Sequence, residues 1–100
     1  MKLRILREAE EEAQASAIWY DEQLVGLGDD FLDELVAALQ QIEHDPDRFP
    51  KLETAKSKQI RRCRLARFPY LIIFEILDTE IVVLAVAHSK RRPNYWRQRK

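Results

Sequence analysis

Two nearly uninterrupted apolar runs in the second half constrain the fold of this chain more than any other feature. Residues 70–77 are YLIIFEIL and residues 81–88 are IVVLAVAH, and both runs are rich in β-branched side chains. Such runs are typical of strands that are buried on much of both faces. The Asp78-Thr79 link between them is short enough for a hairpin turn, so the two strands are predicted to pair.

The N-terminal part predicts a short strand followed by a helix. Residues 2–6, KLRIL, alternate polar and apolar side chains as a strand does. From Glu8 an acidic first turn suits the positive end of a helix dipole. Gly26 and Gly28, the only glycines in the chain, stand where this helix should stop. The apolar positions of the helix recur every three or four residues and are Ala9, Ala13, Ala17, Tyr20 and Leu24.

A second helix is predicted to begin at Asp29 or Asp30, either of which can cap its N-terminus, and to end before Pro46. The two helices are close in sequence and are expected to form an antiparallel hairpin. The apolar stripe of the second helix consists of Phe31, Leu32, Leu35, Val36, Leu39 and Ile42.

The remaining segments complete an α+β order. Residues 47–57 indicate a loop, and residues 60–67 alternate cations with Cys63 and Leu65 as a strand would. The predicted order is β-α-α-β-β-β, in which a helical hairpin packs on a mainly antiparallel four-stranded sheet. A chain of 100 residues with this order is expected to be one domain, residues 1–100.

Charge divides the chain into two halves. Residues 1–50 hold 4 Lys/Arg and 13 Asp/Glu, a net of −9, whereas residues 51–100 hold 13 and 4, a net of +9. Such asymmetry indicates an acidic or polyanionic partner for the basic half. The alternative is that the two halves neutralise each other in the folded chain.

The sequence favours a cytoplasmic protein without membrane contact. No apolar run approaches the roughly 20 residues that span a bilayer. The N-terminus, MKLRILREAEEE, becomes acidic too early to resemble a signal peptide. A lone cysteine, Cys63, excludes an internal disulfide framework and suits a reducing compartment.

Four segments, taken together and in this order, resemble a known family. They are AIWYDEQLVGLGDDFLDEL (17–35), FP (49–50), IRRCRLARFPYLIIFEI (60–76) and AVAHSKRRPNYW (85–96). The chain resembles the RelE/ParE superfamily of toxins from type II toxin–antitoxin modules, of the plasmid-stabilisation type, and is more similar to the ParE-like branch. The resemblance implies a small bacterial protein that inhibits growth and forms a hetero-oligomer with a cognate antitoxin, which neutralises it. ParE-like members poison DNA gyrase, whereas RelE-like members are ribosome-dependent endoribonucleases that cut mRNA.

The nuclease alternative would need a metal-independent catalytic set. Such cleavage requires proton transfer and fixed cations at the scissile phosphate, and His88 is a side chain that can exchange a proton near neutral pH. The candidate catalytic residues are His88, Arg62, Arg91 and Tyr95. Arg62 and Arg64 resemble the basic pair on the corresponding strand of the RelE-like nucleases, and Arg91 and Tyr95 match their tail pattern. Two departures leave this set incomplete, because Leu71 and Ser89 occupy positions where those nucleases carry arginines.

The incomplete set favours the gyrase-poisoning branch. Inhibition of gyrase would be binding chemistry and would need no acid–base pair. Arg, Tyr and Trp are common at the energetic centres of protein interfaces. The candidate contact residues near the C-terminal end are Arg91, Arg92, Tyr95 and Trp96. A third alternative is a non-catalytic module that still binds an antitoxin but has lost its activity.

A cationic strand is the candidate site for the antitoxin. The residues are Arg61, Arg62, Arg64 and Arg67, and antitoxins of this superfamily commonly wrap their toxin with an acidic segment. Arginines bind carboxylates well, often bidentately, and Arg62 and Arg64 are two apart and so share a sheet face. The alternative is that these charges protect an edge strand from aggregation.

No metal or cofactor is expected. His44, Asp45 and Asp47 are conceivable ligands, but a helix end running into a turn explains them, and no second ligand cluster appears. The chain has no glycine-rich phosphate loop. Cys63, in a strand with no His or Asp nearby in sequence, is interpreted as a small apolar residue.

Overall fold

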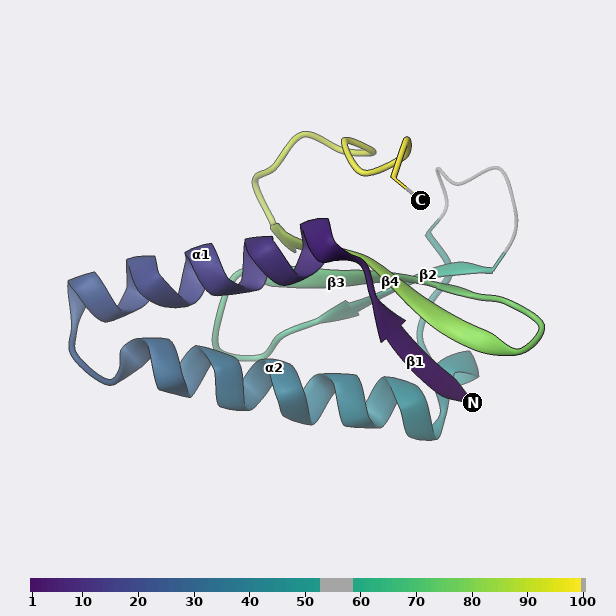
Figure 1. The fold of residues 1–100 in the computed structure, drawn as a ribbon, viewed down its shortest axis with the longest axis horizontal. Coiled ribbons are helices and arrows are strands. Elements are labelled where there is room, and N and C mark those ends of the chain that lie inside the picture. The colour runs from purple at the N-terminus through teal and green to yellow at the C-terminus, as the bar shows by residue number, and fades with distance from the viewer. Residues whose placement is uncertain (53–58, 100) are drawn as a thin grey trace.

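The sheet of this protein is mixed, with the strand order β1-β4-β3-β2 (Figure 1). The computed structural model describes residues 1–52 and 59–99. The elements are β1 (Lys2–Ile5), α1 (Arg7–Gln23), α2 (Leu27–His44), a short 3-10 helix η1 (Pro46–Arg48), β2 (Ile60–Arg64), β3 (Tyr70–Ile76) and β4 (Glu80–His88). β2, β3 and β4 pair antiparallel, whereas β1 is parallel to β4. The predicted α+β fold with a mainly antiparallel four-stranded sheet is confirmed.

Each face of the sheet carries its own apolar cluster, because side chains alternate along each strand. On the helix side, residues such as Ile72 pack with Phe31 of α2. On the opposite side, residues such as Ile73 pack with Trp96 from the C-terminal tail, residues 89–99. We call these faces the helix side and the tail side. β3 and β4 are apolar along nearly their whole length because both of their faces are buried.

The link between the helices differs from the prediction, because neither Asp29 nor Asp30 caps α2. Gly26 is the N-cap residue and has a φ of 93°, a left-handed conformation that glycine adopts without steric cost. The capping carboxylate comes from α1, where Asp21 Oδ1 accepts hydrogen bonds from the N–H groups of Gly26 and Gly28 at 3.0 and 3.1 Å. Asp29 and Asp30 lie in the first turn of α2, where their negative charges interact favourably with the positive end of the helix dipole.

Gly28 lies within α2 and is buried, so it does not end α1, which finishes at Gln23. A Cβ atom at this position would collide with the backbone carbonyl oxygen of Ala17. The second glycine therefore serves the close approach of the two helices.

β2 is shorter than the predicted strand 60–67, because the chain turns toward β3 after Arg64. The N–H of Leu65 donates to the carbonyl of Tyr70 at 3.0 Å. The turn is held from α2 by Glu34, whose Oε2 accepts the N–H groups of Ala66 and Arg67 at 2.6 and 3.0 Å.

The hairpin between β3 and β4 is confirmed, with the N–H of Leu77 donating to the carbonyl of Glu80 at 2.8 Å. In the predicted loop 47–57, Asp47 and Arg48 belong to η1, and Lys51 forms an isolated bridge with Arg61. Residues 53–57 of that loop lie outside the described residues.

Candidate functional site

The tail side of the sheet gathers two of the predicted arginines. Cys63 pairs with Ile72 and belongs to the helix-side core. Its neighbours Arg62 and Arg64 pair with Ile73 and Leu71, which belong to the tail-side cluster. Both arginines therefore project from the tail side, and no polar partner is recorded for either side chain among residues 1–52 and 59–99.

The tail forms one wall of a shallow hollow on this side. The N–H of Arg91 donates to the carbonyl of His88 at 2.9 Å, which turns the chain away from β4. Trp96 is only 5% exposed and packs in the tail-side cluster. Between tail and sheet lies a cavity of about 150 Å³ with an apolar floor and cationic rim, whose lining includes Leu52, Leu71, Ile73, Ala87, Arg91 and Arg92.

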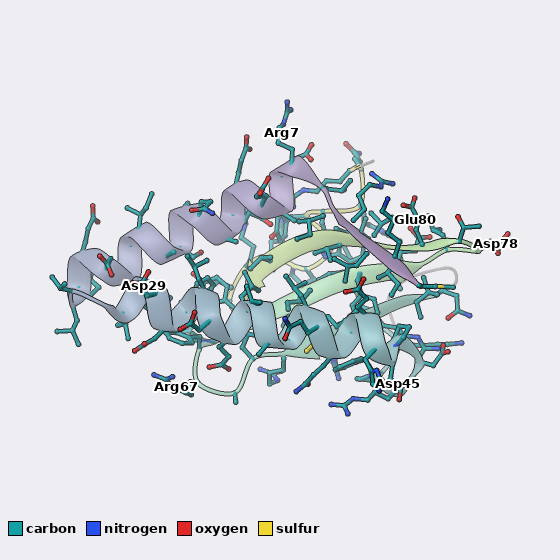
Figure 2. All side chains as sticks on the ribbon, turned by 60° about the horizontal axis from the view of Figure 1, so that its bottom comes forward. Arg7, Asp29, Asp45, Arg67, Asp78 and Glu80 are labelled. Carbon is teal, nitrogen blue, oxygen red and sulfur yellow. The ribbon has the colours of Figure 1, made fainter. Side chains whose placement is uncertain are left out.

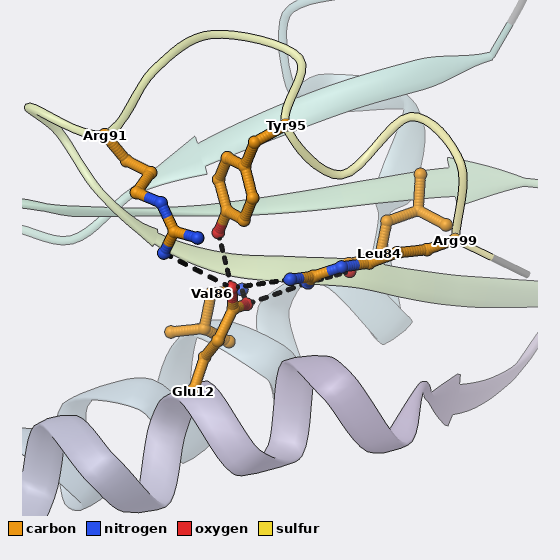
Figure 3. A network of polar contacts seen from close by, with 6 residues as sticks. All are labelled: Glu12, Leu84, Val86, Arg91, Tyr95 and Arg99. Carbon is orange, nitrogen blue, oxygen red and sulfur yellow. Dashed lines mark hydrogen bonds and ion pairs between the residues drawn. The ribbon is translucent and has the colours of Figure 1, made fainter.

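The carboxylate of Glu12, in α1, is the point at which the tail is attached (Figure 3). Oε2 accepts a 2.6 Å hydrogen bond from the Tyr95 hydroxyl. The Arg99 guanidinium binds both carboxylate oxygens, at 3.0 and 2.8 Å. Arg91 lies 3.9 Å from Oε2 and 3.8 Å from the centroid of the Tyr95 ring. Three side chains of the tail therefore converge on one residue of the first helix.

The same contacts close part of the edge of β4. β1 ends at Ile5, and the backbone beyond Val83 lacks a neighbouring strand on that side. Glu12 Oε1 accepts the Val86 N–H at 3.0 Å, and Arg99 donates to the Leu84 carbonyl at 2.9 Å. Side chains thus satisfy backbone groups that a strand would otherwise pair.

The electrostatics of this cluster favour a charged Glu12. Burial raises the pKa of its carboxyl group, but hydrogen bonds from Arg99, Tyr95 and the Val86 amide outweigh burial and lower the pKa overall. Burial and the hydrogen bond to Glu12 raise the pKa of Tyr95, so its phenol stays protonated. Hydrogen bonding to Glu12 raises the pKa of Arg99. The cluster therefore holds one anion and two guanidinium cations at neutral pH.

His88 faces away from the two arginines of β2. It pairs with Tyr70, and the two rings pack edge to face with centroids 5.2 Å apart. Because Tyr70 belongs to the helix-side core, His88 projects toward that side. Its Nδ1 accepts the N–H of Lys90 at 3.0 Å. The residue borders both the tail-side hollow and a second hollow that also contains Trp19. The residues predicted for a nuclease, His88 and Arg62, are on opposite sides of the sheet.

Two other predicted contact residues, Arg61 and Arg67, already bind partners within the chain. Arg61 is on the helix side, its side chain is 11% exposed, and it donates to the carbonyls of Asp47 and Phe49 at 3.1 and 2.6 Å. Arg67 lies beside the start of α2 in Figure 2, 3.7 Å from Asp30. Among the predicted cations on the tail side, Arg64, Arg91 and Arg92 are exposed, whereas Arg62 is half-buried.

Sequence reasoning missed Glu12 and Arg99. Glu12 is one of several acids in α1, and no periodic signal separates it from Glu10 or Glu11. Glu10 and Glu12 both flank the buried stripe of Ala9, Ala13 and Ala17, so helical position does not single out Glu12. Arg99 is one of many cations of the tail, and nothing in its spacing indicates an ion pair.

The described part of the chain offers no metal site. No group of three or more His, Cys, Asp or Glu side chains within residues 1–52 and 59–99 could hold a metal ion. Within the same ranges, none of the helices has the length and apolarity needed to cross a membrane.

Comparison with family models shows the family of this chain, and comparison with solved structures shows a similar fold. Residues 3–93 match the family model described as the ParE toxin of type II toxin-antitoxin system, parDE. Among solved structures, the fold is similar to a chain from the chromosomal ParDE TA system from P. aeruginosa, with a TM-score of 0.72 and 18% sequence identity. That match covers 88% of this chain and 95% of the other. None of the curated proteins compared matches the chain.

Proposed function

Because the chain belongs to the ParE toxin family of type II toxin–antitoxin systems, we propose that it poisons DNA gyrase by binding and that a cognate antitoxin neutralises it. One observation supports binding over RNA cleavage. His88 and Arg62 project from opposite sides of the sheet, and the Tyr95 hydroxyl is bonded to Glu12. His88 and Tyr95 both border the tail-side hollow, but Arg62 is not part of its lining and the Tyr95 hydroxyl is already bonded to Glu12.

A metal-independent nuclease needs a base near the 2′-hydroxyl, an acid near the leaving oxygen and cations at the phosphate between them. His88 lies on the helix side with Nδ1 accepting a backbone N–H. Tyr95 has a raised pKa because of burial and its hydrogen bond to Glu12, which disfavours it as a proton donor. His88, Arg91 and Tyr95 border the same tail-side hollow, but Arg62 is not part of its lining, so the four groups are not all gathered there.

The tail side has the features of a protein-binding surface instead. Arg91 and Arg92 of the tail line the hollow, whose apolar floor includes Leu71 and Ile73. Arg62 and Arg64 of β2 pair with Ile73 and Leu71 and so lie beside this floor. Apolar centres with polar rims are typical of interfaces that bind other proteins. We propose that Arg64, Arg91 and Arg92 contribute contacts to gyrase at this rim.

We also propose that the antitoxin covers this surface with an acidic segment. Carboxylates would pair with Arg62 and Arg64 on one wall and with Arg92 on the other. Apolar side chains of the same segment would fill the cavity of about 150 Å³. The toxin and antitoxin would then form a hetero-oligomer in the cytoplasm, where gyrase acts, and neutralisation would follow because antitoxin and gyrase compete for one face.

The experiment is a pair of assays on the purified chain. A supercoiling assay with purified gyrase is expected to show inhibition that the antitoxin reverses. An mRNA cleavage assay on translating ribosomes is expected to show no new cuts. Cleavage without gyrase inhibition would establish the nuclease alternative. Failure of both assays, with antitoxin binding intact, would establish the non-catalytic module.

A further inference from the structure

We propose that Glu12 is a positioning residue, which holds the C-terminal tail in the conformation that the toxin needs in order to bind its target. The importance of the tail for the target rests on the proposed function. The attachment of the tail to α1 through Glu12 rests on the contacts alone. The Tyr95, Trp96 and Arg99 side chains all lie beyond Pro93, where the family match ends.

The tail has little regular structure to fix its own position. Its described backbone hydrogen bonds are mostly local, such as those from Arg97 to Asn94 and from Arg99 to Trp96, at 3.1 and 3.0 Å. The only tail residue that is fully buried is Trp96. A short segment of this kind stays ordered only where specific contacts tie it down.

The cations of the tail repel one another and the arginines of β2, and a nearby negative charge offsets this repulsion. Residues 89–99 contain five cations and no acidic residue. They cross a face that already carries Arg62 and Arg64. Glu12, whose side chain is 16% exposed, receives Tyr95, Arg91 and Arg99 together and supplies the negative charge at the centre. Removal of that charge leaves two guanidinium groups close together in a partly buried site.

The conformation of the tail matters because it determines where the exposed cations of the tail lie. Lys90, Arg92 and Arg97 point into solvent from the same segment that Glu12 anchors. A tail that is ordered before binding avoids the entropy cost of ordering these long side chains and their backbone on the target. Glu12 would therefore raise affinity for the target without touching it.

The test uses Trp96 as a reporter of the tail. Trp19→Phe removes the exposed indole, so the remaining emission comes from Trp96, which is buried when the tail is docked. In this background Glu12→Gln keeps the side-chain shape and loses the charge. We expect a red shift of the emission and about a tenfold or greater loss of growth arrest at equal protein level. Glu11→Gln, a neighbouring exposed residue of α1, is the matched control and should change neither.

A graded series separates positioning from a merely structural role. Arg99→Lys keeps an ion pair between residue 99 and Glu12, whereas Arg99→Gln leaves Glu12 only its longer ion pair with Arg91. The Glu12 contact with the Val86 amide remains available in both variants. Growth arrest should fall in the order of tail release reported by Trp96. It should not follow the melting temperature of the whole domain. These variants also decide the matter should Glu12→Gln fail to fold.

Two outcomes would overturn the proposal. One is a released tail with undiminished growth arrest, and the other is lost arrest with Trp96 still buried. The target is judged separately. A wild-type chain that arrests growth without inhibiting gyrase would remove the proposed target, whereas the fluorescence and growth series would still decide the role of Glu12.

Discussion

The Tyr95 hydroxyl donates a 2.6 Å hydrogen bond to the Glu12 carboxylate, although the two residues are 83 positions apart. This bond joins the acidic half of the chain to the basic half. Ion pairs also do so. Glu12 pairs with Arg91 and Arg99, Asp30 with Arg67, and Asp47 with Arg61. The division of charge along the sequence is thus partly neutralised within the fold, while Arg64 of β2 and Lys90, Arg91, Arg92 and Arg97 of the tail are exposed.

The first prediction concerns pH. The pKa of Glu12 lies below its ordinary value of 4.5, because hydrogen bonds from Arg99, Tyr95 and the Val86 amide outweigh the effect of burial. Since the folded value is the lower one, the stabilisation is complete above the unfolded pKa and is lost as pH falls through the folded pKa. Glu12→Gln is expected to cost about 1–3 kcal/mol at neutral pH.

Urea unfolding of wild type and Glu12→Gln across a pH series measures this contribution. The difference in unfolding free energy should be constant near neutrality and should shrink as pH falls below about 4.5. A difference that grows on acidification would contradict the lowered pKa. Glu11→Gln provides the control for a generic loss of one carboxylate from α1.

The second prediction concerns the helical hairpin. Gly28→Ala places a Cβ against the Ala17 carbonyl oxygen, so the helices must separate. We expect a loss of about 1–3 kcal/mol from overpacking. An exposed helical glycine would instead gain about 1 kcal/mol from the same change, through helix propensity. The sign of the change in thermal unfolding therefore distinguishes close helix packing from a glycine without a packing role.

The third prediction concerns the turn between β2 and β3. Glu34→Ala leaves the N–H groups of Ala66 and Arg67 without their acceptor, and each lost bond to a charged group costs about 1–2 kcal/mol. Glu34→Gln, which keeps one acceptor oxygen, should lose less. The exposed neighbour Asp33→Ala is the control. Amide exchange should accelerate at residues 66 and 67 first, and exchange that stays slow there would contradict the assigned role.

The sequence predicted the strands and helices because their apolar residues repeat with a fixed period. The runs 70–77 and 81–88 had to be buried, and the stripe from Phe31 to Ile42 had to face a core. The sequence did not predict Glu12, Asp21 or Glu34, although each fixes one connection of the fold. Their partners are backbone amides or side chains brought near by folding, and no local pattern records such a partner.

The same limit explains the mixed result for the candidate site. Alternation correctly grouped Arg62 with Arg64, because side chains two apart on a strand share a face. It could not show that Arg61 would be bound to carbonyl groups of residues 47 and 49, or that Trp96 would be buried against the tail side of the sheet. Aromatic and cationic residues look alike in sequence whether they anchor a segment or face a partner.

The fourth prediction concerns the antitoxin. Arg62→Glu combined with Arg64→Glu reverses two charges on the proposed groove and should weaken antitoxin binding by about 100-fold or more, since each like-charge contact costs several kcal/mol. Wild-type affinity should also fall as salt concentration rises. Titration calorimetry at two ionic strengths measures both effects. Arg7→Glu, an exposed change on α1, is the control, and an equal loss in that variant would remove the assignment of the groove.

The fifth prediction concerns His88 and separates binding from catalysis. If the chain acts by binding on the tail side, His88→Ala should change gyrase inhibition by less than about threefold, because its ring packs against Tyr70 of the helix-side core, although the residue also borders the tail-side hollow. A catalytic histidine would cost about 100-fold or more in rate. Arg92→Ala, an exposed change on the proposed surface, should weaken inhibition more than His88→Ala does. The reverse order, measured in the supercoiling assay at matched folded fractions, would move the working surface to the helix side and to the hollow that His88 shares with Trp19.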